Sequence, residues 1–569
     1  MKLSKTLPTC VLALTVAWSV FSATAHAATN TVMALSSPAS QAIRAIEMRK
    51  INIKTLDNTV FSANIGYLEV PEDRAAPDGN IIKIAFIQIK SSTAGDVPPV
   101  FHFHGGPDDL AYLSKKVPLE LMNNLSGTED ATADFSNASR NYRNYLDFTD
   151  VVVMDVRGLG HSRPRLTCSE NPSSTDFLLE PEARVTNINK ALSACFKEYE
   201  DKGVNLSAYN LSAVAEDFND LRTALGYQKV TLQGSSFGSQ TAFTIMQRYP
   251  QHVARAYLAG LEPLSDTFDM PSEVQQATQA FIALANNDLA VRNQLPNGDM
   301  GYTLRTIMKR LKLAPQTLEI EDPNGAKFEL HLDHHAASQM LLSQGILRYR
   351  GDTRKGSGGA SNIIPLILAL YYEAYDGIAG VLQQELFKSS ATTIFNASAL
   401  ALDCASGVSE ARKKQFETES KLPTTDIILS PFGLEGIVGG KPHSYCANNF
   451  KVQDMGDAWR TEKPLDIPVL FYHGDFDGTT PLANAQRALS RFPNGKLIIV
   501  EGAAHFVKEL ELLSPELKAI RTEFVRTGIL LETVPSKVTL PPIKFQTVST
   551  PVVWAFKMGL GNTLMKLAQ

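Results

Sequence analysis

The chain is poor in cysteine and has no apolar run long enough to span a membrane. It contains 5 cysteines in 569 residues, and none has the C-x-x-C spacing of a zinc or redox site. Its last stretch, VVWAFKMGLGNTLMKLAQ, falls short of the about 18 consecutive apolar residues of a membrane span. Internal repeats are absent. The glycine-rich stretch RKGSGGASN at 354–362 lacks the spacing of a dinucleotide or Walker loop. The sequence therefore offers no signature of a membrane-embedded or nucleotide-binding protein.

The sequence also lacks a large excess of either positive or negative charge. The chain has 54 Lys and Arg against 59 Asp and Glu, a formal net charge of -5. A mildly acidic protein is a poor binder of nucleic acid. A hydrophobic content of 44% with 20% charged residues is that of an ordinary globular protein. At 569 residues the chain exceeds the size at which one core stops growing, so we expect two or more domains or a large insertion.

The first 27 residues have the pattern of a secretory signal peptide. Lys2 and Lys5 precede an apolar stretch, and Ala25-His26-Ala27 fits cleavage before Ala28. A membrane anchor is the less favoured alternative, because the apolar stretch is shorter than the ~20 residues needed to cross a bilayer. Removing this segment takes away two positive charges and moves the formal charge from -5 to -7. We predict a secreted or periplasmic protein.

Four cysteines remain after that cleavage, namely Cys168, Cys195, Cys404 and Cys446. An even number in an oxidising compartment predicts disulfides, and three pairings are possible. Proximity in the chain favours Cys168 with Cys195 and Cys404 with Cys446. Free buried thiols are the alternative.

Short apolar runs alternate with amphipathic helical stretches from about residue 80 to 260, which predicts a mostly parallel sheet. The runs are IIKIAFIQI, PPVFHF, DVVVMDV, KVTLQG and ARAYLAG. About 200 mainly helical residues follow Pro263, including PSEVQQATQAFIALANN and NIIPLILALYYEAYDGIAGVLQQEL, with few strand candidates. The strand pattern returns near residue 468 with IPVLFYHG and GKLIIVEG.

A sheet that is interrupted and then resumed indicates a helical cap inserted into an α/β core. We therefore predict an α/β-hydrolase fold, a mostly parallel sheet with helices on both faces, with the cap before the strand that precedes the catalytic Asp. The predicted boundaries are 1–27 for the signal peptide, 28–265 and 466–532 for the two parts of the core, 266–465 for the cap and 533–569 for a packed C-terminal extension.

The stretch KVTLQGSSFGSQT at 229–241 matches the pattern G-x-S-x-G through Gly234, Ser236 and Gly238. The motif closes a predicted strand and opens a predicted helix, as a nucleophile elbow requires. Small residues flank the serine because the sharp turn brings the strand and helix backbones together. We predict Ser236 as the nucleophile, with an ordinary strand-to-helix turn as the alternative.

A serine hydroxyl needs a base that a carboxylate orients. In this fold the expected order is Ser, then Asp or Glu, then His, each just after a strand. The segment DFDGTTP offers Asp475 and Asp477, either of which could reach the imidazole, and GAAH offers His505 as the base. Backbone N–H donors are also needed for the tetrahedral intermediate. Phe237 supplies one, and Gly105 or Gly106 of FHFHGGP supplies the second.

The stretch HLDHH at 331–335 raises the alternative of a metal site. No partner ligands at defined spacing accompany it, so we interpret it as a solvated polar face. The expected mechanism requires neither a metal nor an organic cofactor.

Together these residues resemble the α/β-hydrolase peptidases of the proline iminopeptidase and tripeptidyl aminopeptidase group. The matching segments, in chain order, are HGGP at 104–107, DVRGLGHSRP at 155–164, AEDFNDLRTALG at 215–226, GSSFGS at 234–239, DGTTP at 477–481 and GAAH at 502–505. In that family the first position of D-x-x-T-P is the catalytic acid, so the resemblance selects Asp477 over Asp475. The predicted cap matches only loosely.

One departure from the family pattern concerns the loop after HGGP, where Asp108 and Asp109 stand in place of glycine. An aminopeptidase must hold a substrate α-ammonium, with a pKa of about 8, and carboxylates would do so by charge-assisted hydrogen bonds. Asp108, Asp109 and Glu262 are hypothetical amine anchors, with solvated loop acids as the alternative.

The leading hypothesis is a secreted serine aminopeptidase of prolyl or tripeptidyl type, acting on peptides with a free N-terminus through Ser236, His505 and Asp477. A carboxylesterase or lipase-like hydrolase with the same triad is the alternative, and a binding protein that has lost catalysis is a third. We expect no nucleic-acid partner and no stable membrane insertion. Oligomeric state and step size are not readable from the sequence.

Overall fold

A computed structural model describes residues 45–93, 95–107, 117–127, 131–135, 142–171, 179–321, 325, 327–338, 340–341, 346–347, 350, 359–379, 396–419, 421, 446, 452–505, 511 and 513–560. These residues all fall within the contact unit Ile43–Gln569. The predicted signal peptide and the loop acids Asp108 and Asp109 lie outside the described residues.

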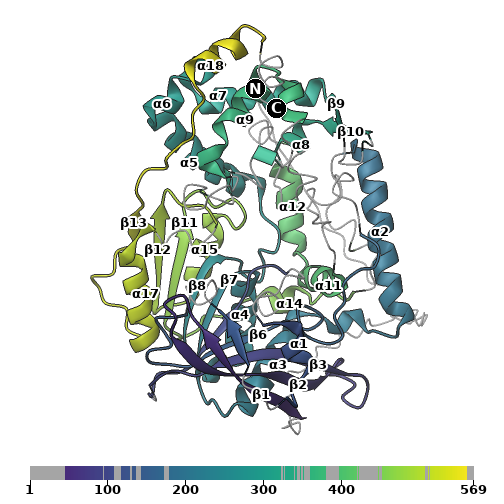
Figure 1. Cartoon of the computed structure of the whole chain (residues 1–569), viewed down its shortest axis with the longest axis vertical. Coiled ribbons are helices and arrows are strands. Elements are labelled where there is room, and N and C mark those ends of the chain that lie inside the picture. Colours follow the sequence, from purple (N-terminus) through teal and green to yellow (C-terminus); the bar gives the residue numbers. More distant parts are fainter. Residues whose placement is uncertain are drawn as a thin grey trace, which may run out of the picture. The chain divides into compact units, whose positions relative to one another are not determined.

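The described part of the chain is organised around a sheet of eleven strands (Figure 1). Along the sheet the order is β13-β12-β11-β8-β7-β4-β6-β3-β2-β1-β5. The strands are β1 (Ile46–Lys54), β2 (Val60–Pro71), β3 (Ile81–Ile89), β4 (Val100–Phe103), β5 (Thr132–Asp134), β6 (Val151–Met154), β7 (Val230–Ser236), β8 (Val253–Leu261), β11 (Val469–Gly474), β12 (Gly495–Glu501) and β13 (Lys537–Thr539).

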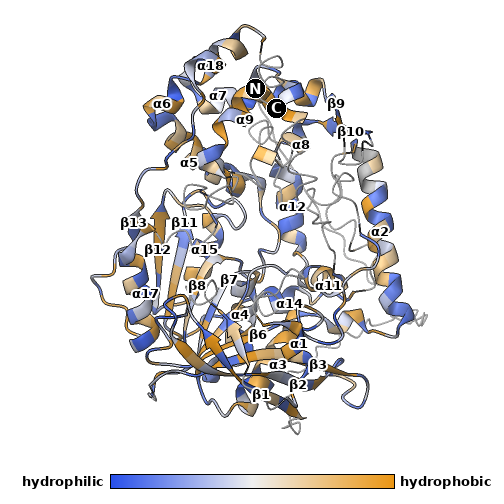
Figure 2. Cartoon of the chain, viewed as in Figure 1, coloured by the Kyte–Doolittle hydropathy of each residue, from blue (hydrophilic) through white to orange (hydrophobic). Residues whose placement is uncertain are grey.

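The half of the sheet from β13 to β6 is parallel, and β3, β2 and β1 extend it as an antiparallel meander. The parallel strands read as continuous apolar runs because both faces are covered, and every residue of β4, β6 and β11 is buried. Figure 2 shows these strands as largely apolar. Each apolar run predicted as a core strand coincides with a strand of this sheet, and the run IIKIAFIQI is the antiparallel strand β3.

Helices cover both faces of this sheet. Those of the described residues are α1 (Leu119–Asn123), α2 (Pro181–Asp201), α3 (Leu211–Ala224), α4 (Phe237–Arg248), α5 (Pro271–Asn287), α6 (Leu289–Arg292), α7 (Met300–Leu313), α8 (His334–Ser338), α9 (Ile364–Tyr371), α11 (Ala397–Ser406), α12 (Glu410–Glu419), α14 (Asp457–Arg460), α15 (Leu482–Leu489), α17 (Pro515–Thr527) and α18 (Thr550–Lys557). Helices α3, α4 and α15 share one apolar cluster with the sheet, and α17 shares another with the opposite face. The fold is that of an α/β hydrolase, as predicted.

Between β8 and β11 the described chain is mainly helical, with two departures from the sequence expectation. Strands β9 (Gln316–Glu321) and β10 (Lys327–Leu332) form an antiparallel hairpin, where few strand candidates were expected. The predicted helical stretch around residue 370 is interrupted after Tyr371, because Glu373 adopts a left-handed backbone with φ 58°. These elements have their own apolar cluster, which also includes Phe476 and Ala504 beside the predicted catalytic Asp and His.

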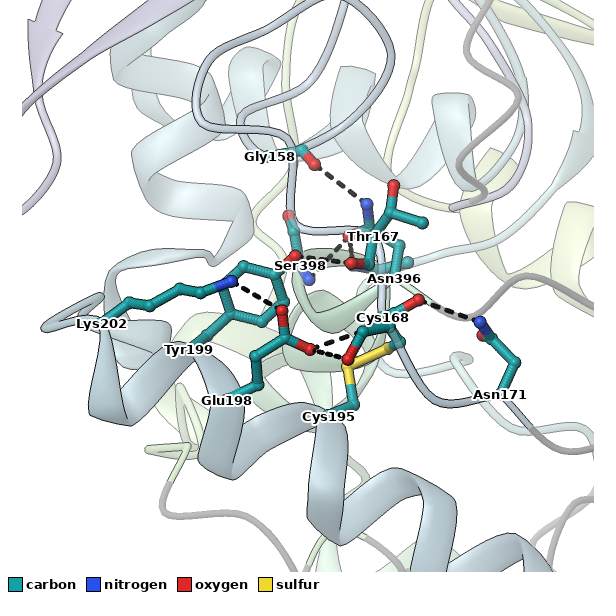
Figure 3. The surroundings of a disulfide bond; sticks show 12 residues. Gly158, Thr167, Cys168, Asn171, Cys195, Glu198, Tyr199, Lys202, Asn396 and Ser398 are labelled. Carbon is teal, nitrogen blue, oxygen red and sulfur yellow. Dashed lines mark hydrogen bonds and ion pairs between the residues drawn. A yellow bond between two sulfur atoms is a disulfide. The ribbon is translucent and has the colours of Figure 1, made fainter.

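Two disulfides lie in one apolar cluster beside α2 and α11. Cys168 pairs with Cys195 and Cys404 with Cys446, the pairing that proximity favours. Figure 3 shows the first of them, where Glu198 of α2 accepts hydrogen bonds from the backbone and hydroxyl of Ser169 next to Cys168. The disulfides therefore join α2 to the segment that follows β6, and α11 to residue 446.

The C-terminal residues 536–557 connect the sheet to the helices that precede β11. Strand β13 adds to β12 in parallel, and Arg350 donates to the Pro541 carbonyl. Farther on, Gln546 N–H donates to Ser361 O at 2.6 Å, and Gln294 Nε2 donates to Val548 O at 2.6 Å. Helix α18 then packs on α9 (Figure 1). We call residues 536–557 the strap, because they contact both the sheet and the helices that precede β11.

None of the helices in the described part of the chain combines the length and apolar character needed to cross a membrane.

The packing of helix α18 in the strap can be tested by substitution, because one face of this helix is buried and the other is exposed. Phe556 is 3% exposed and its ring stacks on Tyr372, whereas Trp554 on the same helix is 59% exposed. We expect Phe556→Ala to lower the free energy of unfolding by about 3–5 kcal/mol, since it leaves a cavity. The matched Trp554→Ala should change it by no more than about 0.5 kcal/mol. Denaturant titration of both variants measures this. Equal effects would contradict the packing of α18.

Candidate active site

Ser236 ends β7, and the next residue begins α4. Its backbone has φ 55° and ψ -132°, which is unusual for a residue with a side chain and carries a cost of roughly 1–3 kcal/mol. The flanking glycines are required by space. A Cβ on Gly234 would lie 2.3 Å from Gly238 O, and a Cβ on Gly238 would lie 2.3 Å from Phe103 O. The G-x-S-x-G pattern thus corresponds to a strand and a helix whose backbones cross in contact.

The turn at Ser236 is braced from the helix side. Ser239 Oγ donates to Ser236 O at 2.6 Å and accepts from the Glu262 N–H at 2.9 Å. The same hydroxyl therefore joins the turn after β7 to the end of β8. Ser235, the neighbouring serine, lies in the strand with a backbone outside the left-handed region.

The predicted acid and base are in direct contact. His505 Nδ1 donates to Asp477 Oδ2 at 2.9 Å, and Thr480 Oγ1 donates to the same oxygen at 2.9 Å. The other oxygen, Oδ1, accepts from the N–H groups of Thr479 and Thr480, each at 2.9 Å. Burial acts to raise the pKa of Asp477, but His505, His473 and Thr480 outweigh it and hold the pKa below its usual value. Asp477 is therefore an ionised partner for an imidazole.

Asp475, the other aspartate of this segment, has a different place. Its Oδ1 accepts from the N–H groups of Gly502 and Ala503 at 2.9 and 3.2 Å. It therefore braces the loop that carries His505 rather than the imidazole itself.

The end of β8 lies between the nucleophile and the base. Ser236 is in register with Leu261, and Gly260 lies against the imidazole, since a Cβ there would be 2.9 Å from His505 Cε1. Gly260 also has φ 53°, so glycine is favoured at this position for two reasons. The three predicted triad residues therefore gather at the carboxyl ends of β7, β11 and β12, around the last residues of β8.

The predicted oxyanion loop lies against the nucleophile turn. A Cβ on Gly105 would be 3.2 Å from Ser236 Cβ and 3.2 Å from Ser235 O. Phe237 is the first residue of α4, where backbone N–H groups have no partner within the helix. Gly106 follows with φ 145°. The two groups of donors expected from the sequence are therefore next to Ser236.

Of the hypothetical amine anchors, Glu262 alone is among the described residues, and the structure adds Asp403 of α11. The two carboxylates interact, since burial and then the charges of Asp403 and Asp266 raise the pKa of Glu262 well above its usual value. Burial raises the pKa of Asp403 to about 7. Both residues are half-buried.

The neighbouring acids show by contrast what is missing around this pair. Asp266 and Glu273 each contact Arg487 and Arg412, with Asp266 at 3.0 and 2.9 Å. Among the described residues, no cation or hydrogen-bond donor contributes to the ionisation of Glu262 or Asp403. This pair therefore consists of two carboxyl groups that have no cationic partner in the described part of the chain.

Sequence reasoning missed Asp403. The signal for it in the sequence was a single aspartate within ALALDCAS. All the remaining residues of that helix are buried. The helix is held to the core by Ser398 Oγ, which donates to Arg157 O at 2.6 Å, and by Asn396 Nδ2, which donates to Gly158 O at 3.0 Å. Arg157 itself is fully buried and forms a two-point ion pair with Asp217. Asp403 thus stands on a firmly anchored helix.

The histidines of HLDHH lie on β10 and α8. Within the described ranges, no three or more His, Cys, Asp or Glu side chains are arranged to hold a metal ion.

Two family models match the chain. Residues 98–310, which include the turn at Ser236, match the model described as alpha/beta hydrolase fold. Residues 440–528, which include Asp477 and His505, match the model described as TAP-like protein.

The curated relatives are a serine protease and a tripeptidyl aminopeptidase. Serine protease Hip1 of Mycobacterium tuberculosis (strain ATCC 25618 / H37Rv) is 26% identical over 220 residues, 37% of this chain and 38% of the relative. Tripeptidyl aminopeptidase of Streptomyces lividans is 26% identical over 201 residues, 33% of this chain and 34% of the relative. The chain thus matches well under half the length of either relative. Among solved structures, a proline iminopeptidase-related protein from Thermus thermophilus is 16% identical with a TM-score of 0.33, covering 82% of this chain and 99% of that one.

The sheet topology and the family matches show that the chain has the α/β-hydrolase fold, and parts of it are similar to a TAP-like protein family and to curated peptidases.

Proposed function

We propose that the protein is an exported serine aminopeptidase that removes N-terminal residues or short peptides, of prolyl or tripeptidyl type, from peptides with a free N-terminus. The observation that carries the proposal is the left-handed Ser236 between β7 and α4, with the buried Asp477–His505 pair at the ends of the neighbouring strands. The peptidase names of the relatives support the reaction class. The two disulfides support an oxidising compartment.

In the proposed mechanism, Ser236 Oγ attacks the scissile carbonyl carbon and its proton passes to His505 Nε2. Asp477 holds the Nδ1–H tautomer and stabilises the imidazolium. The N–H of Phe237 and one from Gly105 or Gly106 bind the oxyanion. His505 then returns the proton to the leaving amine, which leaves an acyl-enzyme on Ser236. Water, deprotonated by His505, adds to the acyl carbon. The bond between that carbon and Ser236 Oγ then breaks as His505 returns the proton to Oγ, which releases the acid product and restores the free serine.

The substrate class follows from the acid pair. Glu262 and Asp403 have no cationic partner among the described residues. A free α-ammonium would supply that positive charge and could form charge-assisted hydrogen bonds to both carboxylates. Glu262 is one residue beyond β8, and its backbone is linked through Ser239 to the carbonyl of Ser236. An amine bound there is close to the nucleophile, which favours cleavage near the N-terminus of a peptide.

The triad is tested with amino-acyl, prolyl and tripeptidyl amides and short-chain esters, each amide with and without N-acetylation. We expect Ser236→Ala to lose roughly 10³- to 10⁶-fold in kcat. Ser235→Ala, the matched neighbour, should retain activity. N-acetylation should abolish amide cleavage in the wild-type enzyme. Ester turnover that is indifferent to an amine would instead indicate an esterase, and activity that survives in Ser236→Ala would refute this nucleophile.

The pH profile tests the amine site. Because the pKa of Asp403 is raised to about 7, its carboxylate becomes available to an ammonium only as the pH rises through about 7. We expect kcat/KM for free-amine amides to rise more steeply over pH 6–8 than kcat/KM for esters without an amine. Asp403→Asn should raise KM for the amides, leave the esters unchanged and remove the difference between the two profiles. The exposed Asp201→Asn is the control. Identical profiles for both substrate classes in the wild type would contradict the amine role.

The same carboxyl predicts a stability effect with a definite sign. A native pKa raised from 3.8 to about 7 means that the native state holds a proton that the unfolded state has released between these pH values. Stability is therefore lost as the pH rises through this window. We expect Asp403→Asn to be more stable than the wild type by roughly 4 kcal/mol at pH 8, and equal to it near pH 4. Urea denaturation at both pH values measures this. A variant that is less stable than the wild type at pH 8 would show that the ionised carboxylate of Asp403 does not destabilise the folded state.

A further inference from the structure

A second histidine, His473, lies beneath the acid of the proposed triad. It is the penultimate residue of β11 and is fully buried. Its Nε2 is 3.7 Å from Asp477 Oδ2. The proposed mechanism gives it no step, and the sequence motifs did not single it out.

The contacts of His473 define its tautomer. The N–H of Leu261, at the end of β8, donates to Nδ1 at 3.3 Å, so Nδ1 carries no proton. Nε2 is then the protonated nitrogen, and it donates to the Thr480 carbonyl at 2.6 Å. His473 is thus a neutral bridge between the end of β8 and the loop that follows Asp477.

Thr480, the residue that His473 holds, surrounds Asp477 with donors. Its N–H donates to Oδ1 at 2.9 Å and its hydroxyl donates to Oδ2 at 2.9 Å. The same hydroxyl lies 3.1 Å from His505 Nδ1. A shift of the Thr480 peptide would therefore move two of the donors to Asp477 and a neighbour of the base.

We propose that His473 is a positioning residue for the Asp477–His505 pair, which it orients by holding the Thr480 peptide from below. This inference rests on the proposed serine hydrolase function. The side chain acts through Thr480 and touches no reacting atom.

A neutral side chain suits this place. Burial lowers the pKa of His473, despite the nearby charge of Asp477, which favours protonation. Asp477 and His505 are the titratable groups that act on His473 among the described residues. An imidazolium here would lose its bond from Leu261 N–H and would compete with His505 for the charge of Asp477. The neutral form leaves that charge to His505.

Two amide substitutions separate the two contacts. Gln places its terminal amide near Nε2 and can still donate to Thr480 O, whereas Asn reaches only the region of Nδ1. We expect His473→Asn to lower kcat by roughly 10- to 100-fold, the range seen when an outer partner of a functional side chain is removed, with little change in KM. His473→Gln should recover most of this loss.

The pH profile distinguishes positioning from general damage. If Asp477 is held less well in His473→Asn, it stabilises the protonated His505 less, so the acidic limb of kcat/KM shifts to lower pH. The limb should return towards its wild-type position in His473→Gln. Inactivation by a fluorophosphonate, which phosphonylates an activated serine with loss of fluoride, should follow the same order. His252→Asn is the control, because that side chain bonds the Gln228 carbonyl just before β8 begins, at the opposite end of the strand from the triad loops.

The outcomes are distinct. Equal losses and equal pH profiles in the Asn and Gln variants would overturn the positioning role. A loss that matches only a smaller folded fraction, measured by circular dichroism and thermal unfolding, would do the same. A wild-type enzyme that neither turns over substrate nor reacts with the fluorophosphonate would refute the serine hydrolase itself.

Discussion

A carboxylate removed from water stays ionised only when hydrogen-bond donors replace the water it has lost. Asp477 is 1% exposed and has four such donors, from Thr479, from Thr480 twice and from His505. Three of them come from residues two and three positions later in the chain, which requires the loop after β11 to fold back on itself. The rest of the site depends on this arrangement, because the imidazole is oriented by the same carboxylate.

The strands of the sheet supply the surroundings of that carboxylate. Parallel pairing of β8, β11 and β12 brings their carboxyl ends to one edge, where Gly260 leaves room for the imidazole. Asp475 secures the loop before His505, and His473 secures the loop after Asp477. Two residues between α8 and α9 reach the same edge, since Leu347 O accepts from Gly478 N–H and Arg350 Nη1 donates to Gly502 O at 2.6 Å. Both loops are thus bonded to residues outside the sheet as well as to the sheet itself.

Glu262 and Asp403 contrast with Asp477, which has four hydrogen-bond donors. They are half-buried and have no hydrogen-bond donor or cation among the residues that the structure describes, while Asp266 and Glu273 nearby have arginine partners. An unpaired buried charge destabilises a folded protein, and such groups cluster where a ligand completes the pairing. Helix α11 is anchored by hydrogen bonds to Arg157 and Gly158 and by the Cys404–Cys446 disulfide. This anchoring keeps Asp403 in place although its ionisation is unfavourable there. The proposed ammonium site is therefore built on a rigid helix.

The sequence by itself determined the elements whose signals are local. Apolar runs predicted the parallel strands, because strands buried on both faces need no alternation, and the glycines around Ser236 predicted the elbow, because only glycine fits where two backbones touch. The order of Ser, Asp and His followed from residues placed just after strands. The chemistry of the residues left Asp475 and Asp477 open, the family resemblance selected Asp477, and the structure shows its contact with His505. The tertiary structure alone decided that Asp403 of a distant helix acts on Glu262 and that His473 supports Thr480. These relations depend on distances between segments far apart in the chain, and no local pattern of residues encodes such distances.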